Sequence, residues 1–191
     1  MTRPIVGVLL AAGSASRFGG GKLMAPLADG TPVGVASLRR LAAQVDTVVA
    51  VVRDNDRSIA QHLGDAGARV TVCPQAAEGM GRSLAWGVRA APLAAGWVVM
   101  LGDMPWIAAT TIAQVVAALR DGAVIAAPRF RGERAHPVGF ASRCYGELAG
   151  LRGDEGARRV VTAYSDRLAI IDVDDPGSVR DVDVPADLRG I

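Results

Sequence analysis

Aromatic side chains are scarce in this sequence: Phe, Trp and Tyr make up 4% of its 191 residues, whereas half of the residues are apolar. Alanine, valine and leucine supply most of that apolar content. This composition argues against a binding module built on aromatic side chains and favours a tightly layered α/β core. The length suits one globular domain with a sizeable core, so we expect residues 1–191 to form a single domain.

The sequence also has little excess charge of either sign. Its 21 Lys and Arg residues oppose 19 Asp and Glu residues, which gives a formal net charge of +2. So small an excess gives no ground for nucleic acid or an anionic membrane as the main partner. Apolar runs that approach the ~20 residues needed to span a bilayer are absent as well. We therefore expect no nucleic acid and no membrane among the partners.

Cysteine is rare, since the sequence has only Cys73 and Cys144. They lie far apart and form no CxxC or Cys/His spacing, which predicts two ordinary thiols in a reducing compartment. Near the N-terminus, Arg3 and the apolar residues after it resemble a short signal peptide. That segment continues into a charged, glycine-rich stretch instead of a disposable junction. We expect a cytoplasmic protein.

Short apolar runs recur along the chain, as expected for strands that are buried on both faces of a parallel sheet. Between them lie segments with helical spacing; the clearest is the apolar stripe Ile112, Val115, Val116 and Leu119. The expected strands are Ile5–Ala11, Thr47–Val52, Val70–Val72, Trp97–Leu101, Val124–Ala127 and Leu168–Ile171, and the other expected helices are Val33–Ala43, Arg57–Ala66, Arg82–Ala90 and Tyr145–Leu151.

The alternation of strands and helices predicts a single three-layer α/β domain, Rossmann-like, with a mostly parallel sheet. In such sheets, ligands bind beyond the carboxyl ends of the strands. The unusual residues of this sequence follow strand ends: the stretch 13–22 follows the first predicted strand, and Gly102 and Asp103 follow the fourth. We expect the functional site there.

The first strand leads into a glycine-rich segment that ends with Gly19, Gly20, Gly21 and Lys22. Small residues allow backbone N–H groups to approach a phosphate, and cationic side chains favour one. The segment is no Walker A loop, because Ser16 and Leu23 stand where that loop needs a glycine and a hydroxyl residue, and it has no GxGxxG fingerprint. A flexible surface turn is the alternative interpretation.

The pattern L-A-A-G-x-x-x-R-x-G-x-x-K in this segment resembles that of the molybdenum cofactor nucleotidyltransferases, a branch of the sugar-nucleotide-type NTP transferases. In that family the loop wraps the nucleotide triphosphate. The resemblance implies that Lys22, which we expect to be an exposed loop residue, contacts the phosphates. It implies catalytic roles for Lys22 and Arg17, and nucleotide binding by Leu10, Ala11, Ala12, Gly13 and Lys22.

Asp103 lies in the segment L-G-D-M-P at the end of an apolar strand. A carboxylate held there suits Mg²⁺, which binds a few carboxylate oxygens together with substrate phosphates; a plain helix cap is the alternative. The resemblance places the family's metal-binding aspartate here, and implies a catalytic role for Asp103. The family's D-x-D-x-P-x-D segment resembles residues 181–187, which implies Asp183 as second metal ligand and leaves Asp181 and Asp187 as structural or capping groups.

Three further segments extend the resemblance from Val8 to Asp187. Residues 79–84 resemble G-M-x-x-S-L, which implies base recognition by Gly81 and Ser83. His136 lies in R-A-H-P-V, similar to the family's R-G-H-P-V, and Asp154 lies in a segment that resembles L-x-G-D-x-G-A-R. Both are expected to bind the acceptor, although a lone histidine is also compatible with an ordinary structural role.

The resemblance implies a Mg²⁺-dependent transfer of CMP from CTP to molybdenum cofactor, with release of pyrophosphate. CTP is expected because relatives that use GTP have Leu-Ala-Gly-Gly where this chain has Leu-Ala-Ala-Gly. A molybdoenzyme of the xanthine oxidase type, or its insertion chaperone, is the expected partner. The alternatives are another acceptor, such as a sugar phosphate or an isoprenoid alcohol phosphate, the use of GTP, or a non-catalytic nucleotide-binding chaperone.

Overall fold

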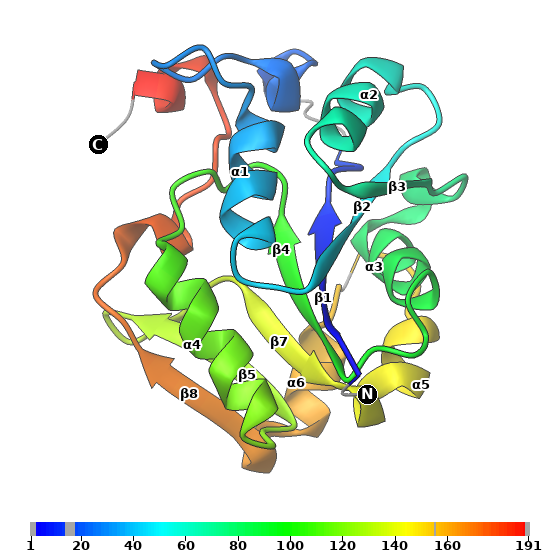
Figure 1. Cartoon of the computed structure of the whole chain (residues 1–191), viewed down its shortest axis with the longest axis vertical. Helices are drawn as coiled ribbons and strands as arrows, with labels where there is room; N and C mark the ends of the chain where they lie inside the picture. The colour runs from blue at the N-terminus through cyan, green and yellow to red at the C-terminus, as the bar shows by residue number, and fades with distance from the viewer. Residues whose placement is uncertain (1–2, 14–17, 155, 190–191) are drawn as a thin grey trace.

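The computed structural model describes residues 3–13, 18–154 and 156–189 (Figure 1). These ranges contain one eight-stranded sheet in the order β3-β2-β1-β4-β7-β5-β6. β7 and β6 pair with the two ends of β5 along one side of that strand, and β8 pairs with β5 along its opposite side. The strands are β1 (Ile5–Leu10), β2 (Thr47–Val52), β3 (Arg69–Val72), β4 (Gly96–Leu101), β5 (Ile125–Phe130), β6 (Glu133–Arg134), β7 (Val138–Ala141) and β8 (Leu168–Asp172).

Helices cover both faces of this sheet and give three layers (Figure 1). One apolar core joins the sheet to α1 (Val33–Ala42), α2 (Arg57–Asp65) and α4 (Ala109–Arg120), and a second core joins its other face to α3 (Met80–Arg89), α5 (Tyr145–Ala149) and α6 (Arg158–Ala163). β1 and β4 are buried almost throughout, because they lie between the two cores. The expected three-layer α/β fold is confirmed.

Close packing of helix on sheet explains one glycine in a helix. A Cβ added to Gly87 of α3 would lie 2.6 Å from Val8 Cγ1 and 2.8 Å from Val51 Cγ2. α3 therefore rests directly on β1 and β2, and alanine would force these strands and the helix apart. This close approach fixes how near α3 lies to β1 and β2.

The six expected strands and five expected helices are all present, with bounds that differ by a few residues. β6, β7 and α6 were not predicted. β7 is antiparallel to both β4 and β5, so the sheet is mixed, with a parallel set on either side of β7. β7 is only four residues long and contains a glycine, and a run of that length has no clear periodicity.

Both cysteines are buried and free. Burial raises the pKa of the Cys144 thiol to about 11, and the charge of Glu147 adds to this shift. The expectation of unpaired thiols is confirmed for both residues. None of the helices in the described ranges is long and apolar enough to cross a membrane.

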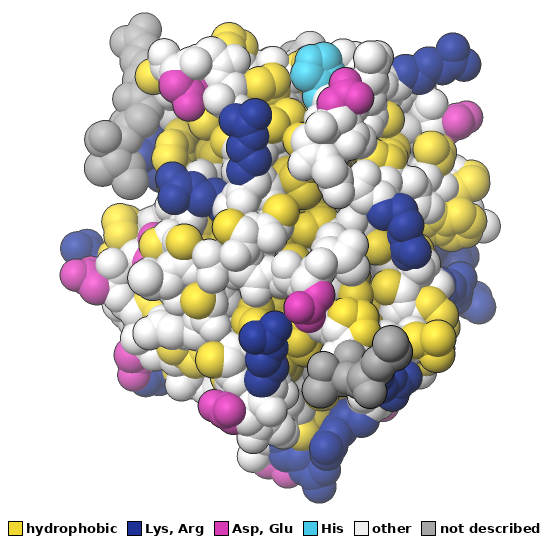
Figure 2. Space-filling model, viewed as in Figure 1, with side chains coloured by type: hydrophobic (Ala, Val, Ile, Leu, Met, Phe, Trp, Pro, Cys, Tyr) yellow, Lys and Arg dark blue, Asp and Glu magenta, His cyan; other side chains and the backbone are white. Residues whose placement is uncertain are grey.

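The face of the molecule shown in Figure 2 carries its Lys and Arg side chains interspersed with Asp and Glu. That mixture matches the small net charge of the sequence. The basic side chains on this face form no continuous stripe of the kind that tracks a nucleic-acid backbone.

Candidate active site

A cleft of about 540 Å³ lies beyond the carboxyl ends of β1, β2 and β4. Its volume is in the range of small-molecule sites. It brings together eight of the residues singled out in the sequence: Leu10, Ala12, Gly13, Lys22, Ser83, Asp103, Asp154 and Asp183. The other lining residues are Phe18, Leu23, Arg53, Ala76, Ala77, Gly79, Met80 and Leu101.

Three consecutive residues of the glycine-rich segment have a backbone conformation that favours glycine. Gly19, Gly20 and Gly21 have φ angles of 83°, 97° and 65°, a left-handed region that other residues rarely enter. Among the described residues, no atom lies within 4 Å of a Cβ added at Gly13, so close packing is not what places a glycine there. Arg17, the other cation expected here, lies outside the described residues.

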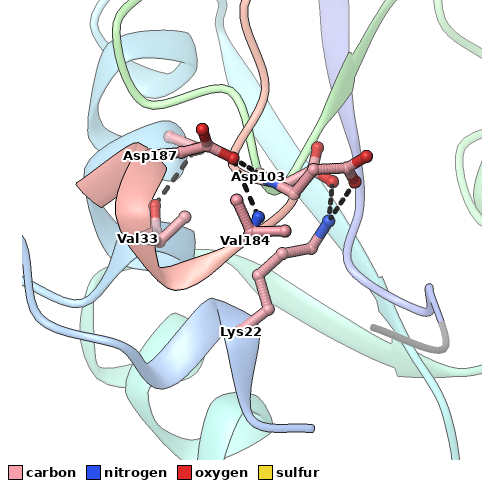
Figure 3. Close-up of polar contacts among 7 residues, drawn as sticks. Lys22, Val33, Asp103, Val184 and Asp187 are labelled. Atoms are coloured by element: carbon pink, nitrogen blue, oxygen red, sulfur yellow. Dashed lines mark hydrogen bonds and ion pairs between the residues drawn. The ribbon is translucent and has the colours of Figure 1, made fainter. Parts of the chain in front are cut away.

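Lys22 begins the short 3₁₀ helix η2 (Lys22–Met24) directly after these glycines. Its Nζ lies 2.6 Å from Asp103 Oδ2 and 3.7 Å from Asp183 Oδ1 (Figure 3). Its side chain is 12% exposed, so the expectation of an exposed loop lysine is wrong. Lys22 is also the only lysine of the chain, since the other basic residues are all arginine.

Asp103 is held in place by the strand end that precedes it and by the C-terminal part of the chain. Gly102 N donates to Leu10 O at 2.9 Å, and a Cβ on Gly102 would lie 3.1 Å from that oxygen, so β1 and β4 end side by side. Asp103 O accepts a hydrogen bond from Val182 N at 2.9 Å. Together these contacts aim the Asp103 carboxylate into the cleft.

One oxygen of this carboxylate, Oδ1, is buried and has no hydrogen-bond partner among the described residues. Buried carboxylate oxygens normally have a partner, so a lone one at a cleft suggests a missing cation or donor. In the described ranges, no group of three or more His, Cys, Asp or Glu side chains is arranged to hold a metal ion by itself. Two carboxylates nevertheless suit Mg²⁺, which completes its shell with water and substrate phosphates.

Asp183 is positioned by the residues around it. Asp187 Oδ2 accepts hydrogen bonds from Asp183 N and Val184 N, both at 2.8 Å (Figure 3). These two bonds lower the pKa of Asp187, and the expected capping role of Asp187 is confirmed. Burial raises the pKa of Asp181, and so does the negative charge of Asp103 and of Asp183.

The start of α3 forms part of the wall of the cleft. Ser83 is 4% exposed and lines the cleft. Gly81 is not among the lining residues: its N–H donates to Gly153 O at 2.8 Å, and a Cβ would lie 2.8 Å from the Arg152 and Gly153 oxygens. Gly81 thus lets the loop that carries Asp154 pack onto the helix. Ala11 does not line the cleft either, since its side chain belongs to the core.

His136 lies outside the residues that line the cleft, on the loop between β6 and β7. The backbone N–H of His136 donates to Ser178 O at 2.8 Å. The ring atom Nδ1 is buried and has no hydrogen-bond partner among the described residues. Burial lowers the pKa of His136 and Arg134 lowers it further, whereas the charge of Asp103 raises it.

Arg53 is a cleft residue that the sequence analysis missed. It directly follows β2, and its Nη2 and Nε donate to Ala12 O at 2.8 Å and 3.3 Å. The guanidinium thereby ties the end of β2 to the first turn of the glycine-rich segment. Asp103 was predicted as a site residue because it follows an apolar run. Arg53 follows the apolar run Thr47–Val52 in the same way, so the same rule would have predicted it.

The ion pair between Lys22 and Asp103 predicts measurable coupling in stability. Lys22→Met should lower the free energy of unfolding by about 1–2 kcal/mol, because it leaves two carboxylates facing each other in a partly buried site. Lys22→Met combined with Asp103→Asn should recover part of that loss. Urea denaturation of the wild type, both single variants and the double variant measures the coupling; strictly additive losses would show that the pair contributes nothing to stability.

Comparisons with known proteins agree with this geometry. Residues 7–168 match the family model described as the MobA-like NTP transferase domain. Purine catabolism protein PucB of Bacillus subtilis (strain 168) is 33% identical over 192 residues, which cover 95% of this chain and 92% of PucB. Nicotine blue oxidoreductase of Paenarthrobacter nicotinovorans is 29% identical over 188 residues, 94% of this chain and 92% of that protein.

A shorter similarity links the chain to the molybdenum cofactor guanylyltransferase of Burkholderia vietnamiensis (strain G4 / LMG 22486), which is 43% identical over 70 residues, 37% of this chain and 34% of that protein. Among solved structures, Rv0371c from Mycobacterium tuberculosis H37Rv has a TM-score of 0.84 at 28% identity, and covers 98% of this chain and 96% of its own. The same protein in complex with manganese has a TM-score of 0.76 at 27% identity, with 100% and 95% covered. Because the family model matches most of the chain and PucB is similar over nearly all of it, this chain belongs to the MobA-like NTP transferase family.

Proposed function

We propose that this protein transfers CMP from CTP to molybdenum cofactor and releases pyrophosphate, with Mg²⁺ as the cofactor. The observation that carries the proposal is the contact of Lys22 with Asp103 and Asp183 in a cleft whose volume suits a small molecule. Family membership supports nucleotidyl transfer as the class of reaction. The acceptor and the base are the finer parts of the proposal.

In the proposed reaction, a phosphate oxygen of the acceptor attacks the α-phosphorus of CTP, and the bond from that phosphorus to the β-phosphate oxygen breaks. Nucleotidyl transfer needs little covalent chemistry from the protein, because positioning and charge neutralisation lower the barrier. Asp103 and Asp183 would hold Mg²⁺, which would offset the negative charge of the triphosphate. Lys22 would move its ammonium from these carboxylates to the phosphates, and the backbone N–H groups of the glycine-rich segment would line the same path. Arg17 is proposed as a second cation for the phosphates.

The base would lie between the end of β1 and the start of α3. Ala12 and Ser83 line the cleft from these two sides, and Leu10, Ala11, Gly13 and Gly81 complete the proposed binding segments. The hydrogen bonds from Arg53 hold the Ala12 carbonyl, and with it the backbone that would form this side of the slot. A slot narrowed by the Ala12 methyl group would favour a pyrimidine over a larger purine.

The acceptor would approach from the side of His136 and Asp154. The name of one relative, a molybdenum cofactor guanylyltransferase, supports this acceptor and favours GTP as the second candidate for the nucleotide. Two other relatives are named for purine catabolism and for an oxidoreductase. These names support the further proposal that the product serves a molybdoenzyme of the xanthine oxidase type, alone or through an insertion chaperone.

The test of the function is incubation of the purified protein with Mg²⁺, molybdenum cofactor and each of the four NTPs, followed by mass spectrometry of the products. We expect the cytosine dinucleotide form of the cofactor and one pyrophosphate for each CTP consumed. Asp103→Asn keeps the size of the side chain and should lower the rate by ~10²-fold or more. Nucleotide binding without any product would favour the non-catalytic chaperone, and product with a sugar or isoprenoid alcohol phosphate alone would favour the other acceptors.

Lys22 and Mg²⁺ would compete for the same carboxylates until a triphosphate draws Lys22 away. Lys22→Met should therefore bind Mn²⁺ alone about tenfold more tightly than the wild type, because an ammonium no longer repels the cation. The same variant should bind CTP more weakly. Electron paramagnetic resonance measures the concentration of free Mn²⁺ in solutions of each protein. Equal Mn²⁺ affinity of the two proteins would show that Lys22 does not compete with the cation.

Because Lys22 is the only lysine, isotope labelling of lysine gives a single side-chain signal by nuclear magnetic resonance. That signal should shift on addition of Mg²⁺ and CTP together and should stay nearly in place with CMP. A shift of the same size with CMP would argue against contact between Lys22 and the outer phosphates.

The base is tested at Ala12, which is 6% exposed and lines the cleft. We expect the wild type to prefer CTP over GTP, and Ala12→Gly to raise the ratio of GTP to CTP efficiency. The gain should be modest, since one methyl-sized change in a pocket is worth roughly 1–3 kcal/mol at most. The measurement is kcat/KM for both nucleotides at constant acceptor. If the wild type prefers GTP, GTP takes the place of CTP in the proposal. If the ratio is unchanged in the variant, Ala12 does not determine the choice of base, and Ser83 is the next residue to test.

A further inference from the structure

The segment 173–187, called the C-terminal strap below, connects β8 to the cleft. β7 is antiparallel to β4 and β5, and β8 is parallel to β5, so β8 runs in the same direction as β4. The chain therefore leaves β8 at the same end of the sheet at which Asp103 follows β4. Figure 1 shows the chain passing the start of α4 after β8. The regular structure of the strap consists of the 3₁₀ helix η6 (Pro176–Val179) and the first residues of the 3₁₀ helix η7 (Pro185–Arg189).

Asp175 attaches the strap to the start of α4. It is 7% exposed, and its Oδ2 accepts hydrogen bonds from Ala108 N at 2.9 Å and from Thr111 Oγ1 at 2.7 Å. Its Oδ1 accepts a hydrogen bond from Gly177 N at 3.0 Å. Ala108 precedes α4 and has no side chain that could cap it, so a carboxylate from 67 residues away occupies the positive end of the helix.

The residues next to Asp175 bring the strap against the loop that carries Asp103. Ser178 donates to Asp175 O through both N, at 3.1 Å, and Oγ, at 2.6 Å. A Cβ on Gly177 would lie 2.1 Å from Trp106 O, so the strap touches the backbone three residues after Asp103. Ser178 O accepts the hydrogen bond from His136 N. The turn at Asp175 is therefore the point where the strap, the Asp103 loop and the His136 loop meet.

Beyond this turn the strap has few apolar contacts. Val182 is fully buried, but Val179 is 42% exposed and Val184 is 41% exposed. Its other attachments are polar or aromatic, and they include the hydrogen bond from Val182 N to Asp103 O, the Arg180 guanidinium 4.3 Å from the centre of the Trp106 ring, and the ion pair of Asp183 with Lys22. A segment with so little buried apolar surface depends on its anchors for a fixed position.

We propose that Asp175 is a positioning residue of the cation and nucleotide site, because it fixes the strap that carries Asp183 opposite Asp103. The proposal rests on the proposed function, since it takes Asp183 as a cation ligand. Asp175 touches neither the cation nor the nucleotide. It acts through the strap, in the way that outer partners orient the ligands of a metal.

The test compares the wild type with Asp175→Ala, Asp175→Asn and the matched control Ile112→Val, which trims the core beneath the same helix. Electron paramagnetic resonance gives the affinity for Mn²⁺ in the presence of CTP, and calorimetry gives the affinity for CTP alone in EDTA. Asp175→Ala should weaken Mn²⁺ binding by about 10–100-fold, the range seen when a partner of a metal ligand is removed, and leave CTP binding in EDTA within about twofold.

Asp175→Asn should fall between Asp175→Ala and the wild type, because its amide oxygen still accepts from Ala108 N and Thr111 Oγ1. This variant also decides the question if Asp175→Ala does not fold. Ile112→Val should lower the melting temperature and leave Mn²⁺ affinity unchanged.

Mn²⁺ affinity equal to that of the wild type in both Asp175 variants would overturn the proposal. A loss of CTP affinity in EDTA as large as the loss of Mn²⁺ affinity would also overturn it, because that result indicates general damage to the cleft. Absence of Mn²⁺ binding in the wild type with CTP would instead count against the proposed function.

Discussion

The contact of one ammonium group with two carboxylates joins three distant parts of this chain. Lys22 follows the first strand, Asp103 follows the fourth, and Asp183 lies beyond the last. Two carboxylates this close repel each other unless a cation lies between them. The order of the strands, the adjacent ends of β1 and β4 and the path of the C-terminal segment bring these three side chains together. A sequence with twenty arginines and one lysine uses its compact, flexible cation at this place.

Much of this arrangement could be predicted from the sequence, because strands buried on both faces read as continuous apolar runs. The runs that end at Ala11 and Leu101 predicted the ends of β1 and β4 to within one residue, and the ends of parallel strands meet at one edge of the sheet. Asp103 was predictable for that reason. Gly13 and Ser83 were predicted from motifs, and both line the cleft.

Other features depend on contacts that local patterns do not encode. β7 is four residues long and lies antiparallel between β4 and β5, a pairing set by the whole sheet. The burial of Lys22 depends on two carboxylates more than 80 residues away, so an exposed loop position was the natural expectation. Asp175 caps a helix that begins 66 residues earlier, and no motif at either place indicates the other. Long-range polar contacts are thus the part of the site that local sequence patterns do not predict.

The length of the strap has a consequence for how Asp183 is presented. Eleven residue steps separate Asp172 from Asp183, enough for about 36 Å of extended chain, whereas three strand spacings from β8 to β4 amount to only about 14 Å. Without its anchors, this slack would make Asp183 a tethered carboxylate at an effective concentration on the order of millimolar. The hydrogen bonds of Asp175 at the start of α4 take up the first part of that slack, and the hydrogen bond from Val182 N to Asp103 O takes up the rest. The second carboxylate is therefore preorganised, and the entropy cost of ordering it is met during folding. The surplus length leaves room for the tether to vary in evolution, provided that the point of attachment is kept.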